Sequence, residues 1–245
     1  MGLMEYVQFT PRQATRPVNK TKTKKKIHKK WVDIDRYIAD RLIPPDRALD
    51  SALELSQTAG LRDHSVSPNQ GKLLMLLAQT VSARAILEIG ALGGYSTIWL
   101  ARALAPGGRL ITLEANPAHA KIACANVARA GLADRVDLRL GKALEALPTL
   151  TAEGPFDFVF IDADRVNIDK YFRWALKLSR RGSLIVVDNV VRHGAVTKRE
   201  DATSQALDRF YCLAAAEPKV SMTAIQTVGV KGHDGFAIAL VTADP

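Results

Sequence analysis

The segment Arg84–Ser96 most strongly constrains how this chain can fold. Ala85–Ile89 is a short apolar run ending at Gly90, which is typical of a strand buried on both faces of a parallel sheet. Gly90 and the pair Gly93-Gly94 allow a sharp turn, and Ser96–Leu104 then has its apolar residues at helical spacing. Because free backbone N–H groups point outward at a helix N-terminus, a strand, glycine turn and helix in succession predict a nucleotide-type binding corner.

The acids around this turn indicate what kind of ligand it binds. The glycines are spaced G-x-x-G-G rather than G-x-G-x-x-G, and Glu88 lies two residues before the first of them. An acid here disfavours a pyrophosphate and favours a cationic ligand, so S-adenosylmethionine fits better than NAD. Glu114 lies 24 positions after Gly90, and an acid about 20 residues past the glycines commonly holds ribose hydroxyls. The alternative, that Glu88 and Glu114 are only polar residues at strand ends and bind no ligand, remains open.

The rest of the chain predicts one doubly wound α/β domain. Apolar runs alternate with helical patterns, which implies parallel strands joined by right-handed crossovers. Helices are expected at Val32–Leu42, Asp46–Gly60, Gln70–Val81, Pro117–Ala130, Gly141–Leu147, Asn167–Ser179 and Ala202–Ala216, and strands at Leu110–Leu113, Val136–Leu140, Phe156–Ile161, Leu184–Val187, Val220–Val228 and Gly235–Val241. A glycine-rich loop joins the last two strands, so the sheet is expected to end in an antiparallel hairpin.

The positive charge is concentrated at one end of the chain. Of a net charge of +9 over 245 residues, residues 1–30 contribute nine Lys or Arg against one acid. Lys20–Lys30 contains seven Lys and no aromatic residue for stacking bases, so we expect a disordered basic extension with at most weak nucleic-acid contacts. Residues 31–245 are then the single folded domain. The longest apolar runs are strand-length, shorter than the roughly 20 residues of a membrane span, so no membrane contact is expected.

The cysteines and the N-terminal residues indicate which cellular compartment to expect for the protein. Cys124 and Cys212 form no C-x-x-C pair, and each lies in a helix-like stretch, so two reduced and mostly buried thiols are expected, with a disulfide left open. No apolar secretory signal precedes the domain. A cytoplasmic protein is therefore expected.

Carboxylates follow two of the predicted strands. Asp162 ends the strand Phe156–Ile161, Asp164 lies two residues later, and Asp188-Asn189 ends the strand Leu184–Val187. The carboxyl ends of parallel strands meet at one edge of a sheet, so these oxygens are expected to converge beside the glycine turn. Hard oxygen ligands of this kind suit Mg²⁺. The alternative is that Asp188 and Asn189 only cap a turn.

Four segments together resemble a known enzyme family. Val66–Lys72, Ile86–Ser96, Phe156–Asp164 and Leu184–Val190 look like the cation-dependent O-methyltransferases of the caffeoyl-CoA type, with catechol O-methyltransferase a more distant relative. The resemblance covers about residues 31–243. It implies a Rossmann-like, seven-stranded methyltransferase fold with the last strand reversed. It also implies S-adenosylmethionine as methyl donor, a divalent cation that is usually Mg²⁺, and a homodimer.

The resemblance assigns roles to particular residues. It places the metal at Asp162, Asp188 and Asn189, and the methyl donor at Val66, Glu88, Gly90, Ala91, Ser96, Glu114, Ala143 and Asp164. The implied reaction is attack of a phenolic oxygen, from a small acceptor with vicinal hydroxyls, on the sulfonium methyl group. Asp162 and Arg165 are the expected catalytic residues.

Position 165 departs from the family pattern. The family usually has Lys there, often assigned as the general base, whereas this chain has Arg165, whose guanidinium stays protonated at neutral pH and cannot act as a base. Either a metal alone acidifies the hydroxyl while Arg165 stabilises the oxyanion, or the enzyme is slow or altered in substrate. A donor-binding protein with weak or lost catalysis, docked to acidic partners by its Lys-rich tail, is the alternative. Glu88 and the glycine spacing disfavour a Rossmann oxidoreductase.

Overall fold

A single seven-stranded sheet forms the centre of the molecule. The computed structural model describes residues 20–62 and 64–244. The strands run in the order β3-β2-β1-β4-β5-β7-β6, and β7 runs antiparallel to both of its neighbours, β5 and β6. Their bounds are β1 Ala85–Ile89, β2 Arg109–Glu114, β3 Val136–Leu140, β4 Phe156–Ile161, β5 Ser179–Asp188, β6 Val220–Gly229 and β7 Gly232–Val241. This is the predicted doubly wound sheet with a reversed last strand.

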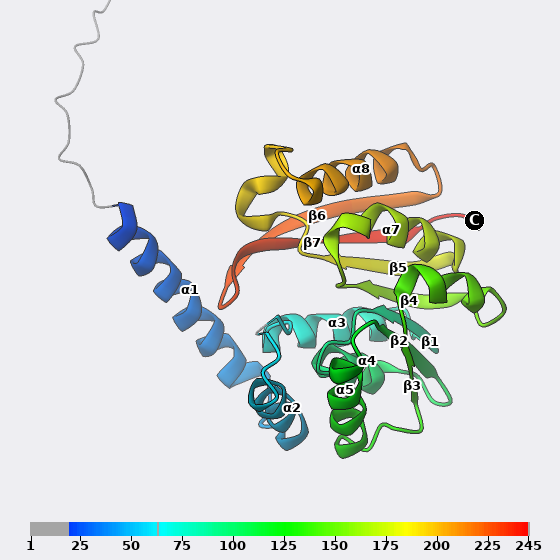
Figure 1. Ribbon diagram of the computed structural model, residues 1–245, viewed down its shortest axis with the longest axis horizontal. Helices are drawn as coiled ribbons and strands as arrows, with labels where there is room; N and C mark the ends of the chain where they lie inside the picture. Colours follow the sequence, from blue (N-terminus) through cyan, green and yellow to red (C-terminus); the bar gives the residue numbers. More distant parts are fainter. Residues whose placement is uncertain (1–19, 63, 245) are drawn as a thin grey trace, which may run out of the picture.

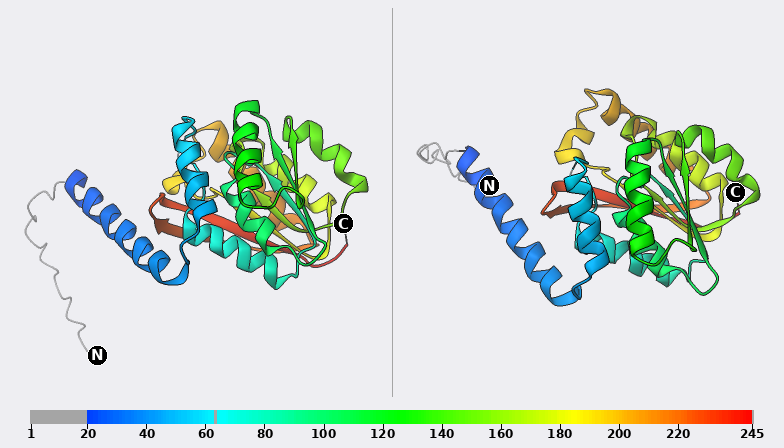
Figure 2. Two further views of the ribbon diagram at one scale, coloured as in Figure 1. Left: turned by 90° about the horizontal axis from the view of Figure 1, so that it is seen from below. Right: turned by 60° about the horizontal axis from the view of Figure 1, so that its bottom comes forward.

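Helices cover both faces of the sheet (Figures 1 and 2). Alternate residues of the central strands point to opposite faces, so Phe158 and Phe160 pack with the helices of one face, whereas Val159 and Ile161 pack with those of the other. The helices are α1 Lys20–Leu42, α2 Arg47–Thr58, α3 Pro68–Thr80, α4 Tyr95–Ala103, α5 Pro117–Arg129, α6 Ala143–Ala146, α7 Ile168–Lys177 and α8 Ala202–Ala216, with 3₁₀ turns η1 Leu147–Ala152, η2 Arg165–Asn167 and η3 Arg192–Thr197.

The first helix begins earlier than predicted. Residues 1–19 of the expected disordered extension lie outside the described residues, but Lys20–Lys30 is helical and continuous with the rest of α1. Lysine is a good helix former, and extending a helix already begun by Trp31–Leu42 needs no new nucleation. The expectation of disorder is therefore wrong for Lys20–Lys30, and the folded helix starts twelve residues before Val32.

Two smaller expectations also change. The thiols of Cys124 and Cys212 lie in helices as predicted, but both residues are exposed rather than buried. The strand expected at Leu184–Val187 begins at Ser179, because Ser179 already pairs with Phe156 of β4. The register then shifts before Leu184 pairs with Phe158, and Gly182 between them has φ +89°. Among the described residues, no helix is long and apolar enough to cross a membrane.

The strand directions bring several chain segments to one edge of the sheet. The parallel strands β1, β2, β4 and β5 all end there. Because β7 runs antiparallel to β5 and pairs Phe236 with Asp188, the turn between β6 and β7 lies at the same edge. This edge therefore combines the glycine turn, both aspartates and the hairpin turn Gly229–Gly232.

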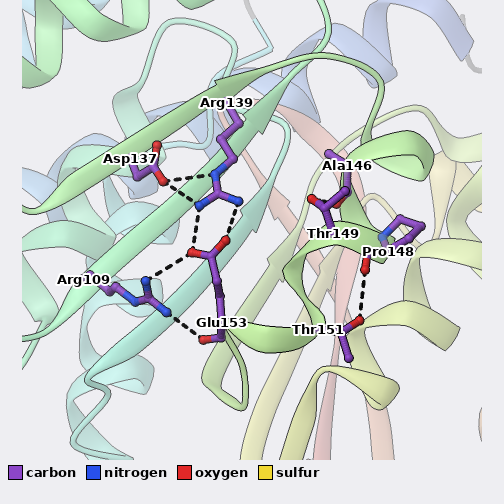
Figure 3. A network of polar contacts seen from close by, with 8 residues as sticks. All are labelled: Arg109, Asp137, Arg139, Ala146, Pro148, Thr149, Thr151 and Glu153. Atoms are coloured by element: carbon purple, nitrogen blue, oxygen red, sulfur yellow. Dashed lines mark hydrogen bonds and ion pairs between the residues drawn. The ribbon is translucent and has the colours of Figure 1, made fainter.

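An ion cluster ties the outer strands together away from that edge (Figure 3). Glu153, which follows η1, pairs with Arg109 of β2 at 3.1 Å and with Arg139 of β3 at 2.6 Å. Arg139 also pairs with Asp137 at 2.8 Å. The hydrogen bonds and charge of Arg139 lower the pKa of Glu153 below its usual value. The cluster thus fixes the segment after η1 to β2 and β3.

Candidate active site

The glycine turn after β1 forms one side of an open cavity. Gly90 has φ +102°, and a Cβ atom there would lie 2.2 Å from the backbone oxygen of Asp162, so only glycine fits. The cavity next to it has a volume of about 200 Å³ and is lined by residues from the turn, the loop before α3 and the end of β4: His64, Ser65, Val66, Gly90, Ala91, Leu92, Tyr95, Ser96, Glu114, Asp162, Ala163 and Arg165. Six predicted site residues, Val66, Gly90, Ala91, Ser96, Glu114 and Asp162, therefore share one cavity, together with Arg165.

Glu88 lies beneath this cavity rather than in its wall. Its side chain is fully buried and accepts hydrogen bonds from the hydroxyls of Ser96 at 2.6 Å, Thr112 at 2.7 Å, and Thr97. Burial raises the pKa of its carboxyl above the usual value. The structure thus shows Glu88 joining the start of α4 to β2, and it reaches the cavity only through Ser96.

Glu114, at the end of β2, lines the cavity directly. One carboxylate oxygen accepts a hydrogen bond from the backbone N–H of Leu92 at 2.8 Å, and the other accepts from the N–H of Asn116 at 2.8 Å. These bonds orient the carboxylate toward the turn and hold the turn closed around it. Glu114 therefore lies in the wall of the cavity beside the glycine turn, and its role toward a ligand stays a prediction.

A second cavity continues on the other side of Gly90. Its volume is about 390 Å³, and its lining includes Gly90, Lys142, Ala143 and Asp164. The Asp164 carboxylate accepts hydrogen bonds from the Tyr171 hydroxyl and from the Asn167 side chain, the latter at 2.6 Å. Ala143 and Asp164 therefore lie at the same extended site as the residues of the first cavity.

The predicted metal residues do converge. The side-chain nitrogen of Asn189 donates to Asp162 at 3.2 Å, and the backbone N–H of Asn189 donates to Asp188 at 2.7 Å. Asn189 has φ +64°, a left-handed conformation that Asn tolerates better than most residues. The strand ends of β4 and β5 thus place two carboxylates and one amide within a single cluster.

The surroundings of the two carboxyls in this cluster disfavour their ionised forms. Burial, and then the charge of Asp162, raise the pKa of Asp188 well above its usual value. Burial also raises the pKa of Asp162, against the lowering effect of the Arg165 charge. Two buried like charges so close together favour a bound cation over the ionised pair alone.

Arg165 is the cationic side chain at the cluster. It follows Asp162 by three residues at the start of η2, and its guanidinium donates a hydrogen bond to the amide oxygen of Asn189. Its Nε is buried and has no hydrogen-bond partner among the described residues. The guanidinium therefore faces the carboxylate cluster without a paired carboxylate of its own.

Sequence reasoning missed Asp234. One of its carboxylate oxygens accepts three backbone N–H groups, from Val191 at 3.0 Å, Arg192 at 2.9 Å and Gly235 at 3.0 Å. Its charge also raises the pKa values of Asp162 and Asp188. Asp234 thus anchors the segment after Asn189 to the start of β7. The signal available in the sequence was the acid between Gly232 and Gly235, but only the antiparallel pairing of β7 places it here.

The residues fit a hard divalent cation. Carboxylate and amide oxygens are suitable ligands. Asp162 and Asp188 bring two negative charges, which the charge of Arg165 and, for Asp162, the smaller effect of Lys231 oppose. The described part of the chain contains no cluster of three or more His, Cys, Asp or Glu residues that suits a metal, so the third ligand would be the amide of Asn189. Binding would require the Asn189 oxygen to turn from Arg165 toward the ion.

Comparisons with known proteins identify the family. A family model described as O-methyltransferase matches residues 47–240. A catechol O-methyltransferase of Mycobacterium tuberculosis is 52% identical, over 85% of this chain and 95% of the relative. The O-methyltransferase from Bacillus cereus, solved in complex with S-adenosylhomocysteine, is 55% identical with a TM-score of 0.86, over 87% of this chain and 99% of the other.

A third match agrees with these. The O-methyltransferase TomG from Streptomyces achromogenes, solved with S-adenosylmethionine, is 49% identical with a TM-score of 0.86, over 88% of this chain and 99% of the other. The resemblance first detected in four short segments thus extends along nearly all of the folded domain. The chain belongs to the O-methyltransferase family.

Proposed function

We propose that this protein transfers a methyl group from S-adenosylmethionine to one hydroxyl of a catechol-type acceptor, with a divalent cation, Mg²⁺ by preference, at Asp162, Asp188 and Asn189. The observation that carries the proposal is the convergence of two half-buried carboxylates and an amide at the edge of the cavity beside Gly90. That cavity lies where a nucleotide-type ligand binds a parallel sheet.

The donor would occupy the two cavities that meet at Gly90. The solved relatives from Bacillus cereus and Streptomyces achromogenes hold S-adenosylhomocysteine and S-adenosylmethionine. In this chain Glu114 would hold ribose hydroxyls, Val66, Ala91 and Ser96 would contact the donor, and Ala143 and Asp164 would line the second cavity. Glu88 would act by orienting Ser96 rather than by contact.

The acceptor ring would lie beside Asp188. A small, mostly apolar pocket lined by Val66, Leu73, Phe160, Phe236 and neighbouring residues opens next to that carboxylate. Val66 also lines the donor cavity, so the pocket and the donor share a wall. The Mycobacterium tuberculosis relative is named for catechol, which has a flat apolar ring and two adjacent hydroxyls. The pocket has a volume of only about 10 Å³, so its side chains would have to move apart to admit such a ring.

The chain's own residues would position the reacting groups and keep water out. A bound divalent cation would supply Lewis acidity, which lowers the pKa of a coordinated hydroxyl. Arg165 cannot accept the hydroxyl proton at neutral pH, because a guanidinium stays protonated in proteins; it would instead place a positive charge beside the attacking oxygen. The buried apolar walls at Val66 and Phe236 would exclude water from a reaction in which charge is lost.

Metal removal gives the direct test. The purified chain is incubated with S-adenosylmethionine and catechol, and methylated product is measured with Mg²⁺, with EDTA, and with EDTA followed by excess Mg²⁺. We expect activity to fall at least about 100-fold in EDTA and to return with Mg²⁺, since the cation both positions and acidifies the hydroxyl. Full activity in EDTA would contradict the metal assignment. Donor binding without methylation of any catechol would favour the alternative of a donor-binding protein.

A further inference from the structure

A cavity outside the proposed active site lies between α7, the end of α8 and the end of β7. Its volume is about 280 Å³, and it is lined by Arg173, Leu176, Lys177, Leu213, Glu217, Lys219 and Val241. Val241 pairs with Val220, at the end of β7 opposite to Phe236, which pairs with Asp188. This α7–α8 cavity therefore lies at the other edge of the sheet, and it shares no lining residue with the cavities beside Gly90.

The walls of the α7–α8 cavity are fixed by packing and by backbone hydrogen bonds. One turn before the cavity, the rings of Phe172 in α7 and Phe210 in α8 pack edge to face with their centres 5.0 Å apart. After α8, the backbone N–H of Val220 donates to the backbone oxygen of Glu217 at 3.2 Å, and that of Thr242 donates to the backbone oxygen of Lys219 at 2.8 Å. The cavity is thus formed before any ligand binds.

The lining combines an apolar surface with an excess of positive charge. The apolar side chains are Leu176 and Leu213, both half-buried, and Val241, which is buried. The charged side chains are three cations and one carboxylate: Arg173, Lys177, Lys219 and Glu217. The carboxylate is already in use, because it accepts the backbone N–H of Lys219 at 3.2 Å.

The three cations form no ion pair with another described residue. The Lys177 ammonium lies over the ring of Trp174, 4.7 Å from its centre. Asp169, one turn before Arg173 on α7, pairs with Arg209 at 3.1 Å instead. The positive charges of the cavity are therefore available to a ligand that brings its own negative charge.

We propose that the α7–α8 cavity binds a small organic anion, in which a carboxylate is joined to an apolar body of several carbon atoms. The apolar body would cover Leu176, Leu213 and Val241, and the carboxylate would bind Arg173 and Lys219. A planar guanidinium can donate two parallel hydrogen bonds to a carboxylate. An anion without an apolar part, such as inorganic phosphate, would leave the apolar wall in contact with water.

Hexanoate and hexanamide test the proposal, because they have the same length and differ in charge. Each is titrated calorimetrically into the full chain, with S-adenosylhomocysteine and Mg²⁺ present to occupy the proposed donor and cation sites. We expect the Kd of hexanoate to be at least about fivefold lower than that of hexanamide. A charged acceptor bonds a guanidinium more strongly than a neutral one does, while partial exposure of the cavity limits the gain.

Arg173→Glu and Lys219→Glu reverse one charge each, on two different walls of the cavity. We expect each to raise the Kd of hexanoate at least about fivefold and to leave that of hexanamide within about twofold. Lys121→Glu on α5 is the matched control, since it makes the same change of charge at an exposed position outside the cavity. It should leave both Kd values unchanged. Urea unfolding checks that each variant is folded, and the exposed Arg173→Glu decides the test if Lys219→Glu does not fold.

Three results would overturn the proposal. They are equal binding of the two probes, no binding of hexanoate by the unaltered chain, and the same loss of hexanoate binding in Lys121→Glu as in Arg173→Glu. Loss of hexanoate binding in Arg173→Glu alone of these two supports it, whether or not the chain methylates catechol.

Discussion

At the scale of single residues, Asp234 links the hairpin to the proposed cation site. Its three backbone hydrogen bonds fix the segment after Asn189, in which Asn189, Arg192 and His193 all have positive φ. Replacing the charged acceptor weakens each of these bonds, since hydrogen bonds to ionised groups are stronger than neutral ones. The left-handed segment then loses its main support.

We therefore predict that Asp234→Asn weakens Mg²⁺ binding about tenfold and lowers the free energy of unfolding by about 1–3 kcal/mol. Titration calorimetry and urea unfolding measure the two effects. Asp157→Asn is the control, because Asp157 also accepts two backbone N–H groups, from Arg84 and Ala85, but at the opposite end of the strands. It should reduce stability and leave Mg²⁺ affinity unchanged. Equal loss of affinity in both variants would show that Asp234 has no particular role at the site.

Residue types and spacing predicted much of this site. The Asp162 and Asp188-Asn189 cluster and the position of Glu114 followed from strand ends that must share one edge of a parallel sheet. The burial of Glu88 could not be predicted, since it depends on three hydroxyls, from Ser96, Thr97 and Thr112, that only the folded chain brings together. The role of Asp234 could not be predicted for the same reason, because Val191 and Arg192, which donate to its carboxylate, lie more than forty residues away in the sequence.

At the scale of the secondary-structure elements, the Glu153 cluster stabilises the outer part of the sheet in a pH-dependent way (Figure 3). Because Arg139 lowers the pKa of Glu153 in the folded chain, the carboxylate adds stability at pH values above its unfolded pKa, near 4.5, and that stability is lost as the pH falls through the lowered folded pKa.

We predict that Glu153→Gln lowers the free energy of unfolding by about 0.5–1 kcal/mol at pH 7, a modest value because the partners are partly exposed. The difference from the unaltered chain should shrink below pH 4.5. Urea unfolding at pH 7 and at pH 3.5 measures it, with Glu54→Gln, an exposed position on α2, as the control. A difference that does not change with pH would exclude the ion cluster as its cause.

The sequence predicted the bounds of some helices and strands accurately and those of others poorly. The bounds of β1, β3, β4 and α8 match the periodicity of the sequence, because each is delimited by glycine, proline or a capping residue or by a sharp change in hydropathy. The start of α1 was predicted too late in the sequence. The reason is that mutual repulsion among the lysines of Lys20–Lys30 was expected to prevent a helix there. The turn η3 has no hydrophobic period. It is supported instead by Arg192, whose backbone N–H donates a hydrogen bond to the distant Asp234 carboxylate and whose guanidinium pairs with Asp201.

At the scale of the whole molecule, helix α1 carries an apolar stripe that stays exposed among the described residues. Its N-terminal half extends away from the rest of the fold (Figures 1 and 2). Ile27, Ile34 and Ile38 are between 38% and 47% exposed, and with Trp31 they recur at the alternating spacing of four and three residues that packs one helix against another. We propose that this stripe meets a second copy of the chain in a homodimer.

Size-exclusion chromatography with light scattering tests the dimer. We expect the full chain to be dimeric and Ile34→Asp to be monomeric at the same concentration, because a charge in the stripe loses its apolar contact and opposes burial. Arg36→Ala, an exposed change away from the stripe, should remain dimeric. A monomeric unaltered chain at high concentration would contradict the proposal.

The reversed direction of β7 has a wider consequence. It brings the hairpin turn Gly229–Gly232 to the edge where the parallel strands end, yet no residue of that turn lines either donor cavity. Changes in the length and composition of this turn are therefore expected to leave the two proposed donor cavities intact. The turn is free to diverge among relatives while the rest of the edge is inherited unchanged.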